Sequence, residues 1–197
     1  MRILAAIVVA ALALAGPALA ANRPEAPPPT APGAAPKSKA AQLDELFQTL
    51  MTGKDATAAK AAEAAILRLW LQSGSDTVDV LMGWSMQAMA EKDYALALDY
   101  LDRITVLEPA YAEGWNKRAT VYFLLEDYAR SISDIHKTLA LEPRHFGALA
   151  GLGMILGNLG EKRRAIDAYR QALAVDPHLD NIRQALEKLE KETERDI

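Results

Sequence analysis

Residues 112–143 read AEGWNKRATVYFLLEDYARSISDIHKTLALEP, and their pattern of apolar, small and turn residues recurs on both sides at a fixed spacing. Pro109, Pro143 and Pro177 each follow an acidic residue, and the interval between them is 34 residues both times. A period of this length indicates helix–turn–helix units that stack only on their neighbours along the chain. The sequence therefore predicts an all-α fold made of repeats.

The period defines three units, 78–109, 112–143 and 146–177, whose large apolar, small and proline positions match. The matching residues of the second and third units are Trp115, Ala119, Tyr122, Ser131, Ile135, Thr138 and Pro143, then Leu149, Leu152, Gly153, Leu156, Ala165, Tyr169, Ala172 and Pro177. In the first unit they are Leu81, Trp84, Ser85, Ala97, Leu101 and Pro109. With these residues the chain resembles the tetratricopeptide repeat family, in its exported bacterial type. The resemblance implies a right-handed helical solenoid over 76–177.

The small residues of this pattern have a packing role. We expect six of them to let the two helices of each unit approach closely, while large residues fill the space between units: Ser85, Ala97, Ala119, Ser131, Gly153 and Ala165. Asp93 and Asp127 stand at matching places in the turn within a unit, where each carboxylate can cap the second helix. Arg118 replaces the family's usual leucine and predicts a polar centre.

The amino-terminal 20 residues have the features of a secretory signal peptide. Arg2 precedes an apolar run from 3 to 15, and Ala18-Leu19-Ala20 offers small residues at a cleavage site. The run is short for a membrane span, although an uncleaved anchor is the alternative. We expect export, to a bacterial periplasm, with no stable membrane insertion after cleavage. Residues 21–38 hold six of the ten prolines and predict a disordered linker.

Helical periodicity begins near residue 39 and continues to the carboxyl terminus. Residues 39–75 predict a helical hairpin without the repeat signature, which we interpret as a degenerate or capping unit at the amino-terminal end of the stack. Residues 178–197 place apolar side chains along one stripe among Glu and Lys, which predicts a capping helix at the other end. A coiled-coil arm for oligomerisation is the alternative for this last helix.

The composition favours no nucleic-acid partner and no catalytic chemistry. The formal net charge is −4 without a basic excess, and cysteine is absent, so disulfides, thiol nucleophiles and lipoprotein attachment are excluded. The histidines His136, His145 and His178 lack the spacing of metal ligands. Serines and carboxylates form no catalytic constellation, and Asp134 is among the carboxylates expected on solvent faces. We expect no enzymatic activity, no cofactor and no metal.

Two further features have structural interpretations. The glycine-dense segment 147–160 follows a helix rather than a strand, so close helix packing is favoured over a phosphate loop. The tryptophans Trp70, Trp84 and Trp115 occur on apolar faces and are expected in the core.

The resemblance also implies that the first helices of the units line a concave groove for a peptide or a partner's helix. By register, the groove residues are Met82, Met86, Met89, Glu113, Asn116, Lys117, Thr120, Met154 and Asn158. One end of this groove is rich in methionine, which suits variable apolar ligands. The sequence thus predicts a non-enzymatic, exported module for protein–protein interaction or assembly. The alternative is a structural spacer or accessory subunit of a cell-envelope complex whose groove is unoccupied.

Overall fold

The computed structural model describes residues 37–52 and 55–195. The expected signal peptide and nearly all of the expected linker lie outside this part. The described elements are all α-helices. They are α1 (Lys39–Thr52), α2 (Ala56–Trp70), α3 (Asp76–Ala90), α4 (Tyr94–Leu107), α5 (Ala112–Leu124), α6 (Tyr128–Leu141), α7 (Phe146–Asn158), α8 (Lys162–Val175) and α9 (Asp180–Arg195). The prediction of an all-α fold is confirmed, and none of these helices is long and apolar enough to cross a membrane.

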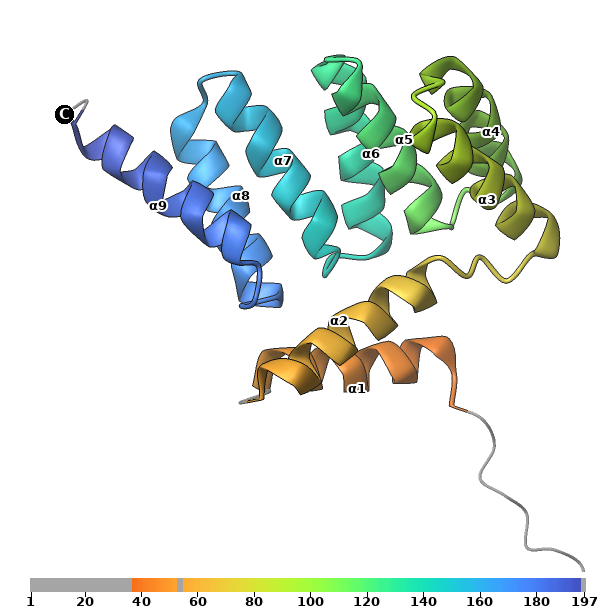
Figure 1. Ribbon diagram of the computed structural model, residues 1–197, viewed down its shortest axis with the longest axis horizontal. Coiled ribbons are helices and arrows are strands. Elements are labelled where there is room, and N and C mark those ends of the chain that lie inside the picture. Colours follow the sequence, from red (N-terminus) through yellow and green to blue (C-terminus); the bar gives the residue numbers. More distant parts are fainter. Residues whose placement is uncertain (1–36, 53–54, 196–197) are drawn as a thin grey trace, which may run out of the picture. The chain divides into compact units, whose positions relative to one another are not determined.

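Three helix pairs, α3–α4, α5–α6 and α7–α8, follow one another as stacked units (Figure 1). The same turn joins the helices of each pair, because a residue with left-handed backbone ends the first helix at Lys92 (φ 62°), Glu126 (φ 59°) and Gly160 (φ 76°). Asp93 and Asp127 then cap the second helices by accepting backbone N–H bonds, each at 3.1 Å. The expected capping is thus confirmed for two units.

The small residues bring the paired helices together as expected. All six are buried, and Ser131 Oγ donates to the carbonyl of Ala119 across the α5–α6 pair at 2.8 Å. Gly153 is the closest approach, because an added Cβ would lie 2.5 Å from the ring of Tyr169. The size of these side chains therefore sets the separation of the helices within a unit.

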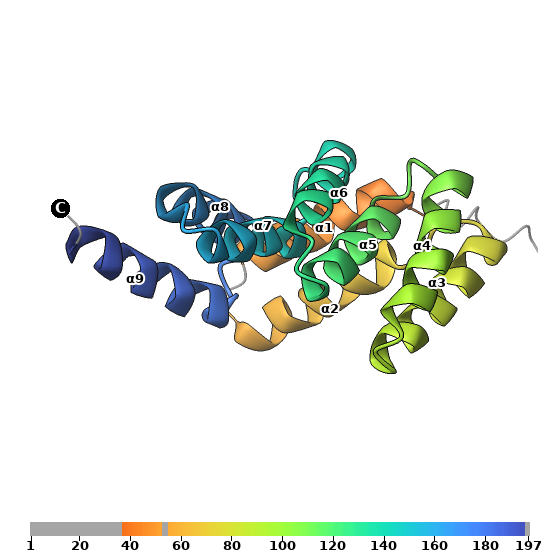
Figure 2. The same ribbon diagram turned by 90° about the horizontal axis from the view of Figure 1, so that it is seen from above.

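The α1–α2 hairpin does not continue the stack. Its apolar face packs against Phe146 at the start of α7 and against Val175 and Leu179 around the turn between α8 and α9. Figures 1 and 2 show the hairpin running along the edge of the units where α5 and α7 begin. The expectation that it caps the amino-terminal end of the stack is therefore wrong, since its apolar stripe is buried on the third unit instead.

The three tryptophans differ in how deeply they are buried. Trp70 is buried and stacks on His145, with ring centroids 4.1 Å apart and planes 9° apart. Trp84 of α3 is 54% exposed, which corrects its expected place in the core. Trp115 is partly buried and donates from Nε1 to the carbonyl of Pro109 at 3.0 Å.

At the carboxyl-terminal end of the stack, α9 packs its apolar stripe on α8 through Ile182 and neighbouring leucines.

Candidate binding cleft

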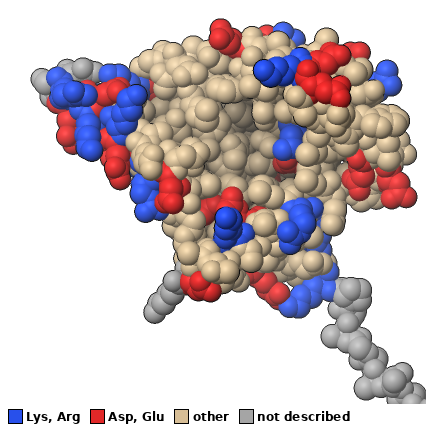
Figure 3. Space-filling model, viewed as in Figure 1, with Lys and Arg blue, Asp and Glu red and all other residues tan. Residues whose placement is uncertain are grey.

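An apolar cleft of about 410 Å³ opens between α5 and α7. It reaches down to α6 and is bounded on one side by the turn that leads into α9. The lining residues are Asn116, Ala119, Thr120, Phe123, Leu124, Ser131, Ile135, Phe146, Gly147, Ala148, Ala150, Gly151, Met154, Ile155, Leu179, Asn181 and Ile182. None of them is charged. Figure 3 shows a hollow on this face that is surrounded mainly by uncharged residues, with a few acidic and basic side chains near one edge.

The cleft exists because small residues occupy its walls. Ala119 on α5 and Ala148 and Gly151 on α7 line it, and a Cβ added to Gly151 would still lie 3.8 Å from the side chain of Ile135. Larger side chains at these places would fill the space between the two units. The helices of the second and third units therefore diverge over an apolar floor, and side chains of a ligand can enter between them.

Three of the residues expected in a concave groove line this cleft together. Asn116 and Thr120 project from α5, and Met154, 43% exposed, projects from α7. Asn158, one turn further along α7, lies outside the cleft and lines an adjoining recess with Met154. Its Nδ2 donates to the hydroxyl of Tyr128 at 3.1 Å. Uncharged amide and hydroxyl groups thus supply the polar rim of an otherwise apolar site.

The methionines expected in the first unit do not line the cleft. Met82 is only 2% exposed and cannot contact a ligand from solvent, and Met89 is partly buried against the core of the first unit. Met86 is 41% exposed, but it lies on α3, outside the cleft. The expectation of a methionine-rich end of the groove is therefore wrong, because Met82 and Met89 pack within the α3–α4 pair.

Glu113 and Lys117 also have another role than the one expected from register. Glu113 is 5% exposed and accepts three hydrogen bonds, from His145 Nε2 at 2.9 Å, Lys117 Nζ at 2.9 Å and Asn116 Nδ2 at 3.2 Å. Burial raises the pKa of the Glu113 carboxyl, but the bond from His145 and the charge of Lys117 outweigh it, so the pKa lies below its ordinary value. The carboxylate is a buried link between α5 and α7.

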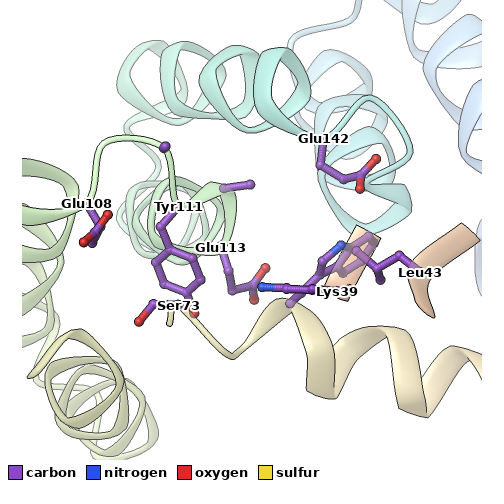
Figure 4. A pocket seen from close by; sticks show the side chains of 10 residues that line it. Lys39, Leu43, Ser73, Glu108, Tyr111, Glu113 and Glu142 are labelled. Carbon is purple, nitrogen blue, oxygen red and sulfur yellow. The ribbon is translucent and has the colours of Figure 1, made fainter. Parts of the chain in front are cut away.

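His145 acts as the amino-terminal cap of α7. Its Nδ1 accepts the backbone N–H of Ala148 at 3.1 Å, so Nε2 carries the proton that it donates to Glu113. Figure 4 shows Glu113 beside Lys39 and Tyr111, where the hairpin meets the second unit. The Tyr111 hydroxyl donates to the carbonyl of Leu71 at 2.9 Å, and burial raises its pKa. These contacts hold the hairpin on the units.

The expected polar centre is present around Arg118. Its guanidinium bonds both carboxylate oxygens of Asp134, at 2.7 and 2.9 Å, and reaches Asp102 of the preceding unit at 2.8 Å. The bonds to Asp134 raise the Arg118 pKa against the effect of burial. Asp134 is only 4% exposed, which corrects its expected place on a solvent face. The pair spans the α5–α6 helices and is structural.

Sequence reasoning missed the part of the cleft that comes from outside the first helices. Ile135 of α6 lies at its floor, and Leu179 and Ile182, expected only in a capping stripe, form one wall. The glycine-dense segment was a further signal for the cleft, because Gly147 and Gly151 of α7 are among its lining residues. Within 37–52 and 55–195, no three His, Asp or Glu side chains gather as a metal site.

Comparison with known proteins agrees with this architecture. The family model "Tetratricopeptide repeat" matches residues 146–179. A TPR repeat-containing protein of Rhizobium etli is 42% identical over 136 residues, which cover 69% of this chain and 67% of that protein. A small glutamine-rich tetratricopeptide repeat-containing protein of Saccharomyces cerevisiae is 30% identical over 52% of this chain and 29% of its own length.

Solved structures show the same arrangement of helices. The first TPR domain of Spaghetti, bound to an HSP90 peptide, has a TM-score of 0.57 at 22% identity and covers 59% of this chain and 92% of its own. The crystal structure of MamA has a TM-score of 0.57 at 20% identity, over 73% of this chain and 85% of that one. At these identities the likeness concerns the fold.

Proposed function

Because the chain belongs to the tetratricopeptide repeat family, whose domains are protein–protein interaction modules, we propose that it binds an apolar segment of a partner protein in the α5–α7 cleft. The observation that carries this proposal is the composition of the cleft. Most of its 17 lining residues have aromatic, aliphatic or small side chains. The polar ones are uncharged: Asn116 and Thr120 on α5, Ser131 on α6 and Asn181 on α9. Such a site recognises a ligand by apolar burial and a few directed hydrogen bonds.

The chemistry of the walls narrows the ligand. The relative named Spaghetti holds a peptide of sequence SRMEEVD, which carries two glutamates and an aspartate. The α5–α7 cleft offers no basic residue to such carboxylates, and Lys117 of α5 is engaged with Glu113. Burying an uncompensated carboxylate is costly. We therefore expect an uncharged, apolar segment, and not an acidic carboxyl terminus, in this cleft.

The proposed place of action is outside the cytoplasm. The basic residue, apolar run and small residues of 1–20 support export through a cleavable signal peptide, and the proline-rich segment after it suits a tether. Expression of the full chain in a Gram-negative host tests this directly. Mass spectrometry of the periplasmic fraction should find an amino terminus at or beside Ala21, whereas recovery of the full-length chain in the membrane fraction contradicts it.

A second function is a spacer or accessory subunit with an empty cleft. The buried Arg118–Asp134 and Glu113–His145 links favour it to the extent that they stiffen the units. The two functions differ in whether the cleft is occupied. A photoreactive residue at Thr120, in the cleft, should cross-link a partner in an envelope extract, while the same residue at Ala140, exposed on α6, should not.

A matched pair of variants completes the test. Met154→Glu places a charge against the bound apolar segment and should weaken partner binding at least a hundredfold. Met51→Glu changes an exposed methionine of α1, outside the cleft, and should leave binding unchanged. Both variants should melt like the wild type, because both side chains face solvent. Equal partner binding by a folded Met154→Glu protein would favour the spacer.

A further inference from the structure

The repeat register identifies a second surface, at the end of the stack where α3 and α4 lie. Residues 84, 118 and 152 occupy the same position of the three units. Arg118 of α5 reaches Asp102 on the preceding α4 at 2.8 Å, and Leu152 of α7 packs in one cluster with Ile135 of the preceding α6. This position thus contacts the second helix of the unit before it. In α3 the residue is Trp84, 54% exposed.

The neighbouring positions of the same helical stripe behave alike. In α5 and α7 they hold Gly114, Val121, Ala148 and Ile155, all buried. A Cβ added to Gly114 would lie 2.7 Å from Ile104 Cγ2 of α4, which shows how closely the preceding helix approaches. Their equivalents in α3 are Val80, 49% exposed, and Gln87, also exposed. The stripe that receives a helix in the other two units is therefore open in the first.

Apolar side chains of α4 extend this open stripe. Leu96 is 39% exposed, and the rings of Trp84 and Tyr100 lie 5.7 Å apart between their centroids. Together with Gln87, Ala88 and Glu91, these three residues enclose a recess of about 190 Å³. We call the surface formed by Val80, Trp84, Gln87, Leu96 and Tyr100 the first-unit end face. A solenoid end normally carries polar residues or a capping helix, but here apolar side chains predominate and no helix within 37–52 and 55–195 packs on α3 from this side.

We propose that the first-unit end face docks an amphipathic helix of a partner protein, with basic residues beside its apolar stripe, in the place that α4 takes on α5. Two interfaces inside the molecule show that this stripe has the shape to receive a helix, because the same stripe of α5 and of α7 receives one. The occupant continues the stack by one helix. The surface lies at the end of the stack, apart from the α5–α7 cleft, so this proposal does not rest on the proposed function.

The charge of the first unit selects the kind of helix. Residues 76–109 contain seven acidic and two basic residues, and Glu91 borders the recess itself. Basic flanks on the partner helix complement this field, and acidic flanks oppose it. The same field disfavours a second copy of the chain, because a two-fold contact would bring two acidic first units together.

Two helical peptides test the proposal on the purified protein. Both carry the apolar stripe of α6, Ile132, Ile135 and Leu139, which packs beside α7 in this fold. One peptide has lysines at the outward positions next to the stripe, and the other has glutamates there. Fluorescence anisotropy should show the lysine peptide binding at least tenfold more tightly. Equal affinity of the two peptides, or no binding of the lysine peptide, overturns the proposal.

Variants place the binding on the first-unit end face. Trp84→Glu should weaken binding of the lysine peptide at least tenfold. Gln87→Arg, at an exposed polar position, should weaken it without loss of apolar surface, which keeps the test decisive if Trp84→Glu fails to fold. The control is Val106→Glu, which should leave binding of the lysine peptide unchanged. Val106 is 79% exposed, and the equivalent Ala140 and Ala174 are exposed too, so this position contacts no neighbouring helix in any unit.

Two further results separate this surface from other occupants. Met154→Glu should leave peptide binding unchanged, so failure of this proposal is distinct from failure of the cleft proposal. Sedimentation of the wild type should show a monomer. A dimer that Trp84→Glu dissociates would mean that a second copy covers the face, and would overturn the proposal of a basic partner helix.

Discussion

Replacing Glu113 with glutamine removes the charge of a buried carboxylate that links α5 to the residues before α7. The carboxylate is 5% exposed and accepts hydrogen bonds from His145, Lys117 and Asn116. Glutamine keeps the shape, but its amide nitrogen faces donors, and Lys117 loses its counter-ion. His145 is at the same time the cap of α7 and the stacking partner of Trp70. The substitution therefore weakens the contact among α5, α7 and the hairpin at once.

The expected loss of stability follows from these contacts. Breaking a buried ion pair by removing one partner costs about 3 to 5 kcal/mol, and Lys117, with its side chain 26% exposed, recovers part of its hydration. We therefore expect Glu113→Gln to lower the free energy of unfolding by about 3 kcal/mol. For a folded part of this size, that corresponds to a decrease in melting temperature of roughly 6 to 12 °C.

The pH dependence of this effect has a defined sign. The pKa of Glu113 is lower in the folded protein than in the unfolded chain, so its stabilisation is complete above the unfolded value and is lost as pH falls through the folded one. The difference between wild type and Glu113→Gln should thus be largest at neutral pH and shrink below about pH 4. Thermal melts followed by circular dichroism at several pH values measure it.

The control is Glu187→Gln, at an exposed position of α9. It should melt within about 1 °C of the wild type, as substitutions of exposed residues commonly do. If Glu113→Gln also melts within that margin at neutral pH, the buried carboxylate does not link the units, and the reasoning about this cluster fails.

Three other predictions concern packing. Gly153→Ala should destabilise the protein by about 1 to 3 kcal/mol, because the added Cβ meets the ring of Tyr169. Gly157→Ala has nothing within 4 Å of the added Cβ and should be neutral or stabilising by up to about 1 kcal/mol. The reverse order of the two stabilities in chemical denaturation would contradict the α7–α8 packing. Trp70→Ala should cost about 3 to 5 kcal/mol and increase hydrogen exchange in α1 and α2 more than in α9; equal protection in all three would mean that Trp70 does not hold the hairpin. Asp134→Asn should cost about 1 to 3 kcal/mol by weakening the paired bonds to Arg118, and an unchanged denaturation midpoint would show the pair to be energetically idle.

The sequence by itself determined the helices, their pairing and their order. The 34-residue period, the small residues and the caps at Asp93 and Asp127 are relations between residues close in the chain, and local relations of this kind suffice to specify a helix pair. The same register correctly placed Asn116, Thr120 and Met154 around one site. For these features, the tertiary structure agrees with what the sequence of each repeat predicts.

Only the tertiary structure decided which side chains are exposed at each repeated position. The hairpin packs on α7 rather than on α3, through contacts such as Arg144 to Asp44 at 2.7 Å, a hundred residues apart in the chain. No local pattern determines such a contact. As a result Glu113 is buried and Trp84 is open, although register alone predicted the opposite for both. Equivalent positions differ because burial depends on the neighbour that packs there, and at the ends of a stack that neighbour is not given by the repeat.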